Sequence, residues 1–317
     1  MKAVVVTGGK LSLDASHAKP APERDEVIVK VRYAGVCDTD VGLAAGYLSF
    51  EGVPGHEFVG VVEGGSEAWL GKRVVGEINC ACGVCSHCIQ GRGNHCTYRT
   101  VLGINGRDGC FAEYFKLPTA NLHEIPDDVP DEKAVFVEPL AAAVNVVELT
   151  HVPPTYEIAV VGDGKIGLLV AEVISLSSAA VAVVGHHPGR ADKLAAMGRA
   201  VPILRPDEAP DGHYDVVVEC TGAADGLQHA LRYVRPRGTV VLKTTIADPY
   251  NVDLAPAVIN EVTVAGNRCG PFAPALRMIS EGRVDPTPLI EEIHPVEDLP
   301  DLLARGAPGL KHLIKFE

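Results

Sequence analysis

The sequence predicts an α/β protein in two parts, a β-rich N-terminal part and a doubly wound parallel sheet. Three observations predict this fold class. Short β-branched runs broken by Gly and Pro fill the first part of the chain. From about residue 133, the sequence becomes rich in alanine and other residues that favour a helix. From residue 157 onward, apolar strands alternate with helical segments, which is typical of a parallel sheet covered on both faces.

The N-terminal part contains four runs with the composition of strands. They are VVVTG, VIVKVRYAG, FVGVVEGG and KRVVGE, at residues 4–8, 27–35, 58–65 and 72–77. Their shortness and their Gly and Pro boundaries predict a compact, barrel-like domain. Residues 132–152 then favour a helix, with Pro139 near its start, where the missing N–H of proline is tolerated.

The second part continues as an ordered series of strands and helices. Strands are expected at 157–162, 179–185, 214–222, 239–245 and 262–266, and helices at 165–177, 190–198 and 224–234. Strands of this kind are buried on both faces, so the series predicts one parallel sheet.

The overall composition excludes several classes of protein. The chain has 317 residues, 47% of them hydrophobic, and a formal net charge of −13. Nucleic-acid binding is not expected, because phosphate contacts favour Lys- and Arg-rich faces. The first apolar stretch is too short for the core of a signal peptide, and no segment is long enough to span a membrane. We therefore expect a cytoplasmic protein with about two domains.

Many of the cysteines lie in one short segment, residues 80–96. Nine cysteines are present, an odd number, and the cytosol keeps thiols reduced, so disulfides are not expected. Cys82, Cys85 and Cys88 follow a C-x2-C-x2-C spacing, and Cys96 comes eight residues later. Four thiolates suit a closed tetrahedral zinc site. An iron–sulfur cluster or buried, unmetallated thiols are the alternatives.

A closed site of four thiolates leaves no position for a substrate. The loop therefore predicts a structural role, with the chemistry elsewhere in the chain. Cys80, His87 and His95 are left over in the same stretch, and we expect them to face solvent or to support the thiolates.

A glycine motif follows the first strand of the second part. It reads Gly162-Asp163-Gly164-Lys165-Ile166-Gly167 and opens the next helix, which is the context of a dinucleotide-binding fingerprint. Gly162 permits the tight turn, Gly164 lets the backbone approach a pyrophosphate, and Gly167 lets the helix pack on the strand. The amides at the helix N-terminus favour an anionic group. A purely structural turn is the alternative.

The end of the second strand should distinguish NAD from NADP. A carboxylate there binds the ribose 2′-hydroxyl of NAD, whereas basic residues suit the 2′-phosphate of NADP. The strand runs into Gly185-His186-His187-Pro188-Gly189-Arg190, without a carboxylate and with Arg190 close by. This pattern favours NADP over NAD, with His186, His187 and Arg190 as candidate ribose contacts.

Three separate segments carry further candidate ligands. They are GVCDTD with Cys37, PGHEFVG with His56 and Glu57, and VEPLA with Glu138. Each residue alone fits an ordinary structural role. Together they form a mixed Cys, His and Glu set, which is the kind of set that an open catalytic zinc uses.

The order of GVCDTD, PGHEFVGVV, CGVCSHC, DGCFAEYF, VEPLA and GDGKIG resembles the zinc-dependent medium-chain dehydrogenase/reductase family, the alcohol dehydrogenase superfamily. The glutamate of VEPLA makes the chain most similar to the polyol, threonine and glucose dehydrogenase branches. The resemblance implies a GroES-like catalytic domain over residues 1–143, with a C-terminal return over 276–317. It also implies a Rossmann NAD(P)-binding domain over 144–275.

The resemblance also implies roles for individual residues. Cys37, His56 and Glu138 would hold a catalytic zinc, with Glu57 as an exchangeable ligand. A second, structural zinc would lie on Cys82, Cys85, Cys88 and Cys96. Asp40 would orient His56. Thr39 would relay the proton of the alcohol, whose hydride passes to the nicotinamide.

The chain departs from the family pattern at two positions. Gly42 stands where many relatives have a relay histidine, and Cys110 stands at a usual glycine. The implied function is a zinc- and NAD(P)-dependent alcohol dehydrogenase acting on a polyol, sugar or other secondary alcohol.

Two other functions are the alternatives. The first is a zinc-independent quinone or enoyl reductase of the same fold, whose members lack the ligand cysteine and the cysteine loop. The second is a non-catalytic coenzyme-binding protein. The expected partners are a small-molecule alcohol and further copies of the chain, as a homodimer or homotetramer. Nucleic acid and membranes are not expected partners.

Overall fold

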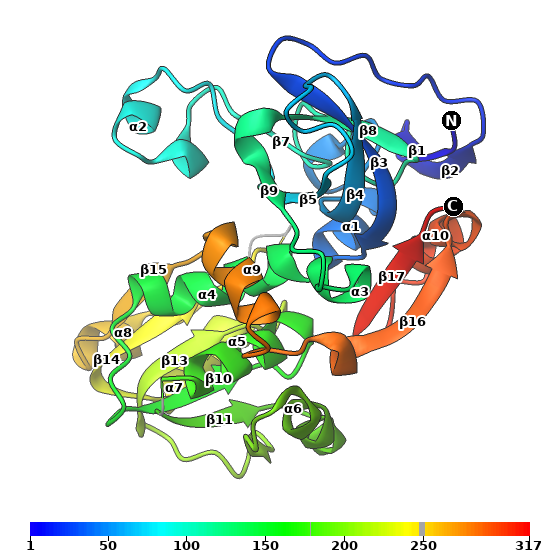
Figure 1. Cartoon of the computed structure of the whole chain (residues 1–317). Coiled ribbons are helices and arrows are strands. Elements are labelled where there is room, and N and C mark those ends of the chain that lie inside the picture. Colours follow the sequence, from blue (N-terminus) through cyan, green and yellow to red (C-terminus); the bar gives the residue numbers. More distant parts are fainter. Residues whose placement is uncertain (178, 247–250) are drawn as a thin grey trace. The chain divides into compact units, whose positions relative to one another are not determined.

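The computed structural model describes residues 1–177, 179–246 and 251–317. The chain forms two compact units (Figure 1). Unit 1 comprises Met1–Glu138, Ala275–Ser280 and Ile290–Glu317. Unit 2 comprises Pro139–Pro274 and Glu281–Leu289. Two later segments of the chain therefore belong to the same unit as its N-terminal part.

Unit 1 is built on a mainly antiparallel sheet. Among the described residues this sheet has the order β16-β17-β3-β4-β5-β9, with β8 paired to β3. The strands are β3 (Glu26–Gly35), β4 (Glu57–Gly64), β5 (Arg73–Gly76), β8 (Tyr114–Pro118), β9 (Leu122–Glu124), β16 (Ile290–Pro295) and β17 (Lys311–Lys315). The two C-terminal strands pair in parallel with each other, and β17 is antiparallel to β3.

Shorter elements complete unit 1. Two small hairpins pair β1 (Ala3–Thr7) with β2 (Lys10–Asp14) and β6 (Asn79–Cys80) with β7 (Thr100–Val101). The helices are α1 (Asp38–Ala44), α2 (Ser86–Ile89), α3 (Asp131–Ala134) and α10 (Leu299–Ala304). Short 3₁₀ turns lie at Tyr47–Ser49, Gly93–His95, Thr119–Asn121 and Val296–Asp298. The cysteine loop contains α2 and projects from this unit (Figure 1).

Unit 2 contains a fully parallel sheet, as the sequence predicts. Its order is β12-β11-β10-β13-β14-β15, counted over the described residues. The strands are β10 (Glu157–Val161), β11 (Ala180–Val184), β12 (Ile203–Leu204), β13 (Tyr214–Glu219), β14 (Val234–Leu242) and β15 (Thr263–Gly266). The sequence analysis missed β12, because two half-buried residues beside a proline give no apolar run.

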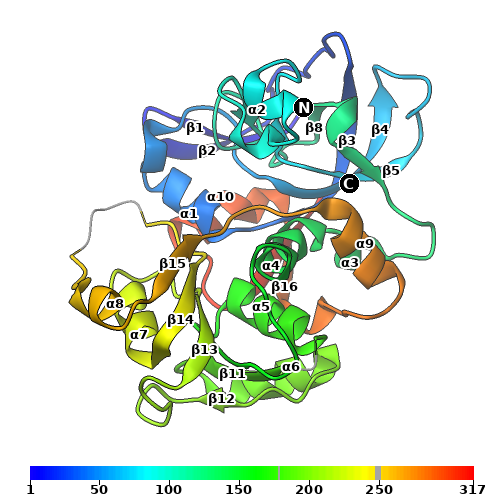
Figure 2. The same ribbon diagram turned by 90° about the vertical axis from the view of Figure 1, so that its left-hand side faces the viewer.

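Helices cover both faces of the parallel sheet. Figure 2 shows α5 and α6 on one face and α7 and α8 on the other. The helices that lie wholly or partly in unit 2 are α4 (Val137–Leu149), α5 (Lys165–Ser175), α6 (Ala191–Met197), α7 (Gly226–Tyr233), α8 (Ala255–Ile259) and α9 (Phe272–Ser280). Two 3₁₀ turns lie at Pro188–Arg190 and Thr287–Leu289. Pro139 is the third residue of α4, near the helix start as predicted.

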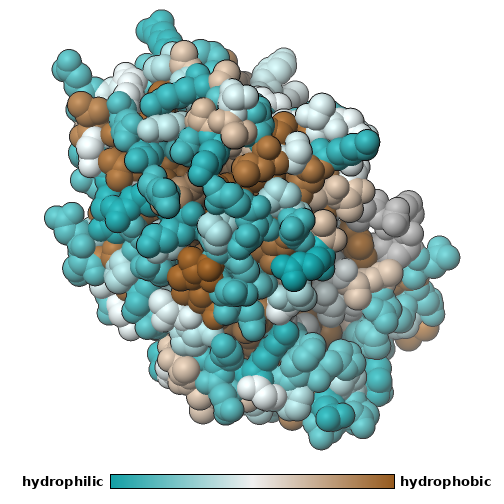
Figure 3. Space-filling view, turned by 90° about the vertical axis from the view of Figure 1, so that its right-hand side faces the viewer, coloured by the Kyte–Doolittle hydropathy of each residue, from teal (hydrophilic) through white to brown (hydrophobic). Residues whose placement is uncertain are grey.

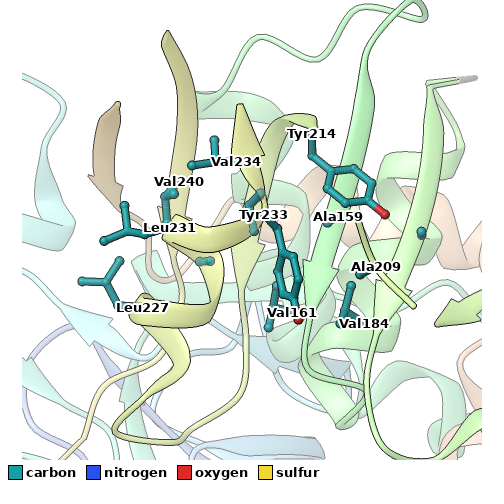
Figure 4. Packing of buried hydrophobic residues seen from close by; sticks show 13 residues of the cluster. Ala159, Val161, Val184, Ala209, Tyr214, Leu227, Leu231, Tyr233, Val234 and Val240 are labelled. Carbon is teal, nitrogen blue, oxygen red and sulfur yellow. The ribbon is translucent and has the colours of Figure 1, made fainter. Parts of the chain in front are cut away.

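A hydrophobic cluster joins α7 to the sheet (Figure 4). Leu227, Leu231 and Tyr233 of α7 pack against Val161 of β10 and Val240 of β14. Each fully buried aliphatic side chain contributes about 1.5–3 kcal/mol to folding. The hydroxyl group of Tyr233, fully buried, donates to the carbonyl of Pro206 at 2.9 Å. The cluster therefore fixes β10, the strand whose end leads into the glycine turn.

The surface is mixed in hydropathy. On the face in Figure 3, hydrophobic residues are interspersed among hydrophilic ones. Over the described part of the chain, every helix is too short or too polar to cross a bilayer.

Candidate functional site

Three different ligand atoms gather in unit 1. The thiol of Cys37, the imidazole of His56 and a carboxylate oxygen of Glu57 all lie within 4.8 Å of one another. Cys37 follows β3 and caps the N-terminus of α1, while His56 and Glu57 lie at the start of β4. Because β3 and β4 pair antiparallel, with Gly35 opposite Glu57, the end of one strand meets the start of the other. The pairing of two strands thus assembles the group.

Asp40 supports two members of this group. Its Oδ2 accepts the N–H of Cys37 at 2.8 Å, and its Oδ1 lies 3.2 Å from Nδ1 of His56. Asp40 is fully buried and His56 is 3% exposed. Burial lowers the pKa of His56, but the negative charges of Asp40 and Cys37 outweigh it and hold that pKa well above its usual value. The position of the imidazole is therefore set by the carboxylate behind it.

Lys311 reaches the same group from the C-terminal strand. Its Nζ lies 2.6 and 2.8 Å from the two carboxylate oxygens of Glu57 and donates to the carbonyl of Val36 at 3.1 Å. Both side chains of the pair are almost completely buried. Burial lowers the pKa of Lys311, but the charges of Glu57 and Cys37 raise it further, so the net shift is upward. The sequence analysis missed Lys311, since its partner lies 254 positions earlier in the chain.

The group has the chemistry of a cation site. A thiolate, an imidazole and a carboxylate match the N, O and S ligands of an open zinc site. The carboxylates of Asp40 and Glu57 lie beside His56 and Lys311 and raise the pKa of these two cationic side chains. The donor types present therefore fit zinc.

Of the other predicted site residues, Thr39 lies beside this group, whereas Glu138 lies outside it. The hydroxyl oxygen of Thr39 is 3.7 Å from the sulfur of Cys37. Glu138 is the second residue of α4 and half-buried. Among the described residues, the group within 4.8 Å contains Cys37, His56 and Glu57 but not Glu138.

Four thiols converge in the cysteine loop. The Sγ–Sγ distances are 3.9 Å for Cys82–Cys88, 3.5 Å for Cys85–Cys88 and 3.8 Å for Cys85–Cys96. A tetrahedron with metal–sulfur bonds of about 2.3 Å has edges of roughly 3.8 Å. These separations are far too long for disulfides, and the thiols are free. The backbone N–H of Cys88 is the main cause that lowers the pKa of Cys85, to about 6, which favours the thiolate needed for metal binding.

The leftover residues of the loop differ from one another. Cys80 was expected to face solvent or support the thiolates, but it is buried in β6 and lies 3.9 Å from the carbonyl of Ile78. It therefore does not face solvent. His87, in α2, is half-buried, and His95, in the 3₁₀ turn Gly93–His95, is exposed.

A third set of ligand-type residues lies in unit 1 and was not predicted. Nε2 of His294 is 3.0 Å from Nδ1 of His312, and Glu292 lies nearby. The other ring nitrogen of His312 lies 2.7 Å from the carbonyl of Pro308. The two imidazoles therefore satisfy one another and the backbone, which explains their burial without a ligand.

The glycine turn of unit 2 has the geometry that the sequence motif requires. Gly162 has φ +111°, and its Cα faces the carbonyl of Cys220 so closely that a Cβ would lie 2.7 Å from that oxygen. A Cβ on Gly167 would lie 2.0 Å from the carbonyl oxygen of Gly162. By contrast, a Cβ on Gly164 would meet nothing within 4 Å. The turn is therefore closed on two sides and open at the N-terminus of α5, where an anionic ligand can approach.

The end of β11 differs from the sequence expectation. No carboxylate was expected there, yet Asp163 of the glycine turn lies against Gly185, and a Cβ on Gly185 would fall 2.4 Å from its Cγ. Its Oδ2 accepts the backbone N–H of His187 at 2.6 Å, and Nη1 of Arg190 lies 3.3 Å from Oδ1. Burial raises the pKa of Asp163, but the bonds from His187 and the charge of Arg190 outweigh it and lower the pKa overall. Residues 185–190 have no carboxylate of their own, as the NADP prediction assumed, but the carboxylate of Asp163 lies beside them.

The other predicted ribose contacts lie around this carboxylate. Nη1 of Arg190 also donates to the carbonyl of Asp163 at 2.7 Å. His187 has a side chain 60% exposed, with Nδ1 at 3.1 Å from Oδ1 of Asp163. His186 is exposed. Lys165 and Ile166, the first residues of α5, are half-buried.

Comparison with known proteins identifies relatives for both parts of the chain. A model of the alcohol dehydrogenase GroES-like domain matches residues 23–127, and a model named zinc-binding dehydrogenase matches residues 166–281. Sorbitol dehydrogenase of Halalkalibacterium halodurans is 30% identical over 322 residues, with 94% of each chain covered. L-threonine 3-dehydrogenase of Bacillus licheniformis is 30% identical, with 93% of each chain covered.

Solved structures are similar over the full length. A protein of Sinorhizobium meliloti 1021, assigned as a zinc-binding dehydrogenase and bound to NADP, has a TM-score of 0.89 at 28% identity, covering 99% of each chain. A protein of Escherichia coli CFT073, described as a short chain alcohol dehydrogenase and complexed with the cofactor NADH, has a TM-score of 0.88 at 26% identity. That match covers 100% of this chain and 99% of the other.

The buried Glu57–Lys311 pair yields a prediction about stability. Lys311→Met leaves the Glu57 carboxylate buried without its cation, which should lower the free energy of unfolding by about 3–5 kcal/mol. Lys311→Met with Glu57→Gln should recover part of this loss, because the stranded charge is gone. Urea denaturation with the Cys37 group free of metal measures both, because Glu57 then has no metal ion to bind in place of Lys311.

Lys315→Met is the matched control, because Lys315 lies on the same strand and is exposed. It should change the free energy of unfolding by less than about 0.5 kcal/mol. Equal stability of Lys311→Met and the unchanged protein would contradict the importance of the pair.

Proposed function

Because the chain belongs to the zinc-dependent medium-chain dehydrogenase/reductase family, in its polyol and threonine dehydrogenase-like branches, we propose that it transfers a hydride between a secondary alcohol and NAD(P). The substrate class is a polyol, a sugar or another hydroxylated small molecule. The predicted GroES-like and Rossmann-type fold is confirmed. We retain the proposed division into a catalytic domain over 1–143 and 276–317 and a coenzyme domain over 144–275.

One observation carries the proposal of a catalytic zinc. Cys37, His56 and Glu57 bring sulfur, nitrogen and oxygen donors within 4.8 Å of one another. We propose Cys37 and His56 as permanent ligands. Glu138 would bind directly or through water. Glu57 would bind only when it leaves Lys311, since the lysine now holds both of its oxygens.

The bound groups would supply the two reactive functions: zinc a Lewis acid for the alcohol oxygen, and nicotinamide the hydride acceptor. The chain's own residues position and move the proton. The hydroxyl of Thr39 would accept the proton of the alcohol, and Asp40 would keep His56 in one orientation. Gly42 offers no side chain to continue the relay, so the proton path beyond Thr39 is short or passes through solvent.

We propose that Cys82, Cys85, Cys88 and Cys96 hold a second, structural zinc. Their sulfur separations of 3.5–3.9 Å support a tetrahedral site more than an unmetallated core. Four thiolates leave no coordination position for a substrate. This loop therefore stabilises the fold and does not take part in hydride transfer.

The coenzyme would bind at the glycine turn. Gly162, Gly164 and Gly167 would cradle the pyrophosphate with the first amides of α5, beside Asp163, Lys165 and Ile166. His186, His187 and Arg190 would lie toward the adenosine ribose. The sequence preference for NADP now rests on Arg190 alone, and the guanidinium of Arg190 contacts Asp163.

The zinc-independent reductase reading is not favoured. Its members lack the ligand cysteine, whereas here Cys37 lies beside His56, and the matched relatives are named alcohol, polyol and threonine dehydrogenases. We propose a cytoplasmic location, because free thiols at ligand spacing suit a reducing compartment.

The decisive test compares three variants of the catalytic group. Cys37→Ala should lose about one zinc per chain and all measurable alcohol oxidation, since it removes the anionic soft ligand. Glu138→Gln should retain metal but lose roughly ten- to a hundredfold in turnover. Thr39→Val should retain both zincs and lose rate in proton release, most visibly at lower pH. Metal analysis, NADH binding and oxidation of a panel of polyols, aldoses and secondary alcohols measure these effects.

All three variants should bind NADH as tightly as the unchanged protein, because the glycine turn is untouched. Alcohol oxidation at the original rate by Cys37→Ala would contradict the zinc mechanism and favour the reductase.

A separate test concerns the structural zinc. Cys88→Ser should release about one zinc per chain and lower thermal stability, because metal binding at such a site contributes directly to folding. His87→Ser, in the same turn, is the matched control and should retain the metal. Loss of turnover by Cys88→Ser with both metals and full stability retained would assign the loop to catalysis instead.

We propose that the chain forms a homodimer through the edge of the parallel sheet. Within the described residues, β15 pairs on one side only, with β14. Val264 on this strand and Val258 and Ile259 on α8 are exposed, the last two by 77%. An unpaired apolar edge favours pairing with another chain, and a second copy presents the same edge. A homotetramer would need a further surface.

Val258→Lys should therefore shift the protein toward monomer. Placing a charge in this apolar surface should raise the dimer dissociation constant by roughly tenfold or more, measured by sedimentation velocity. Leu70→Lys is the control, since Leu70 is 60% exposed in unit 1. A monomeric unchanged protein, or the same assembly for both variants, would refute this interface.

A further inference from the structure

We propose that Asp163, a residue of the glycine turn, reads the adenosine ribose and makes the protein prefer NAD to NADP. This inference rests on the proposed coenzyme site and reverses the preference expected from the sequence. In a Rossmann fold, the residue that distinguishes the coenzymes follows the second strand, where a carboxylate binds the 2′-hydroxyl. Here that place is taken by Gly185, which has no side chain.

The carboxylate of Asp163 occupies the space beside Gly185. A Cβ built on Gly185 would lie 2.4 Å from both Cγ and Oδ2 of Asp163 and 2.6 Å from its Cβ. Such distances occur only between atoms of one side chain, so the Asp163 carboxylate occupies the volume that a side chain at 185 would fill. The end of β11 thus has its carboxylate, supplied from the turn after β10.

Hydrogen bonds hold this carboxylate in place. The backbone N–H of His187 donates to Oδ2 at 2.6 Å, and Nη1 of Arg190 donates to the backbone carbonyl of Asp163 at 2.7 Å. The bond from His187 orients the carboxylate, and the bond from Arg190 holds the backbone of the turn. Two side chains also contact the carboxylate: Nη1 of Arg190 lies 3.3 Å from Oδ1, and the ring of His187 is 60% exposed and can move aside. A carboxylate accepts up to about four hydrogen bonds, so capacity remains for a ribose hydroxyl.

The charge of this carboxylate also disfavours NADP. The 2′-phosphate of NADP carries about two negative charges and would meet a fixed carboxylate, which repels it. Arg190 is the cation that would otherwise attract this phosphate, but its Nη1 lies 3.3 Å from Oδ1 of Asp163. The carboxylate therefore opposes NADP twice, by direct repulsion and by offsetting the charge of Arg190.

Direct binding of coenzyme tests the proposal without alcohol turnover. The dissociation constants of NADH and NADPH are measured by fluorescence on the full, zinc-loaded chain. We expect NADH to bind more tightly. Asp163→Asn keeps the shape and removes the charge, so it should move the NADPH/NADH affinity ratio toward NADPH by roughly ten- to a hundredfold. Adding Arg190→Met to Asp163→Asn should abolish the gain in NADPH affinity.

An exchange of the two residues provides a positive test. Asp163→Gly with Gly185→Asp returns the carboxylate to the strand end and should restore the preference for NADH. Asp192→Asn is the matched control, because Asp192 is an exposed carboxylate in the first turn of α6. It should leave the affinity ratio within about twofold of the starting value.

Each remaining outcome overturns the inference. Tighter binding of NADPH by the unchanged protein, an unaltered ratio in Asp163→Asn, or an equal shift in Asp192→Asn would exclude Asp163 as the discriminating residue. Failure of the unchanged protein to bind either coenzyme would instead refute the proposed coenzyme site, which is a different result. A purely structural role for Asp163 predicts weaker binding of both coenzymes at a constant ratio.

Discussion

The balance of buried charge around Glu57 constrains the whole of unit 1. Asp40, Glu57, His56 and Lys311 are each at most 3% exposed, and an isolated charge in such surroundings would cost several kcal/mol. Each of them therefore needs a partner of opposite sign at short range. Glu57 has Lys311, and Asp40 has His56. Replacing one member of a pair by an apolar residue would leave the charge of the other member buried without a partner. A substitution at one of these residues therefore also affects its partner.

This requirement explains why the chain returns to its first unit. Lys311 can reach Glu57 only if β17 lies beside β3, and the pairing places Leu313 opposite Gly35. The C-terminal strand is thus part of the candidate site, although the residues that it joins are 254 positions apart. Forming this ion pair closes a long loop, so its formation carries the entropy cost of a non-local contact.

The sequence predicted what depends on local pattern. Alternating strands and helices, the glycine turn at 162–167 and the spacing of the four loop cysteines all follow from short-range rules, and the structure has them. The sequence did not predict β12, which is too short for a pattern, or Lys311, whose role depends on strand pairing. It also did not predict that the carboxylate of Asp163 lies at the end of β11, because this residue belongs to the turn after β10.

The carboxylates of Glu57 and Asp163 share one physical arrangement. A Cβ on Gly35 would lie 2.2 Å from Oε2 of Glu57, and one on Gly185 would lie 2.4 Å from Oδ2 of Asp163. In both cases a glycine at a strand end leaves space that a carboxylate from a neighbouring segment fills. Neither glycine has a positive φ, so backbone conformation does not require glycine at either position. Close approach does, because any side chain would displace the carboxylate and the cation bound to it. At both strand ends, the functional side chain therefore belongs to a residue from a neighbouring segment and not to the strand-end residue itself. The space beside the glycine, and not the sequence position, identifies that residue.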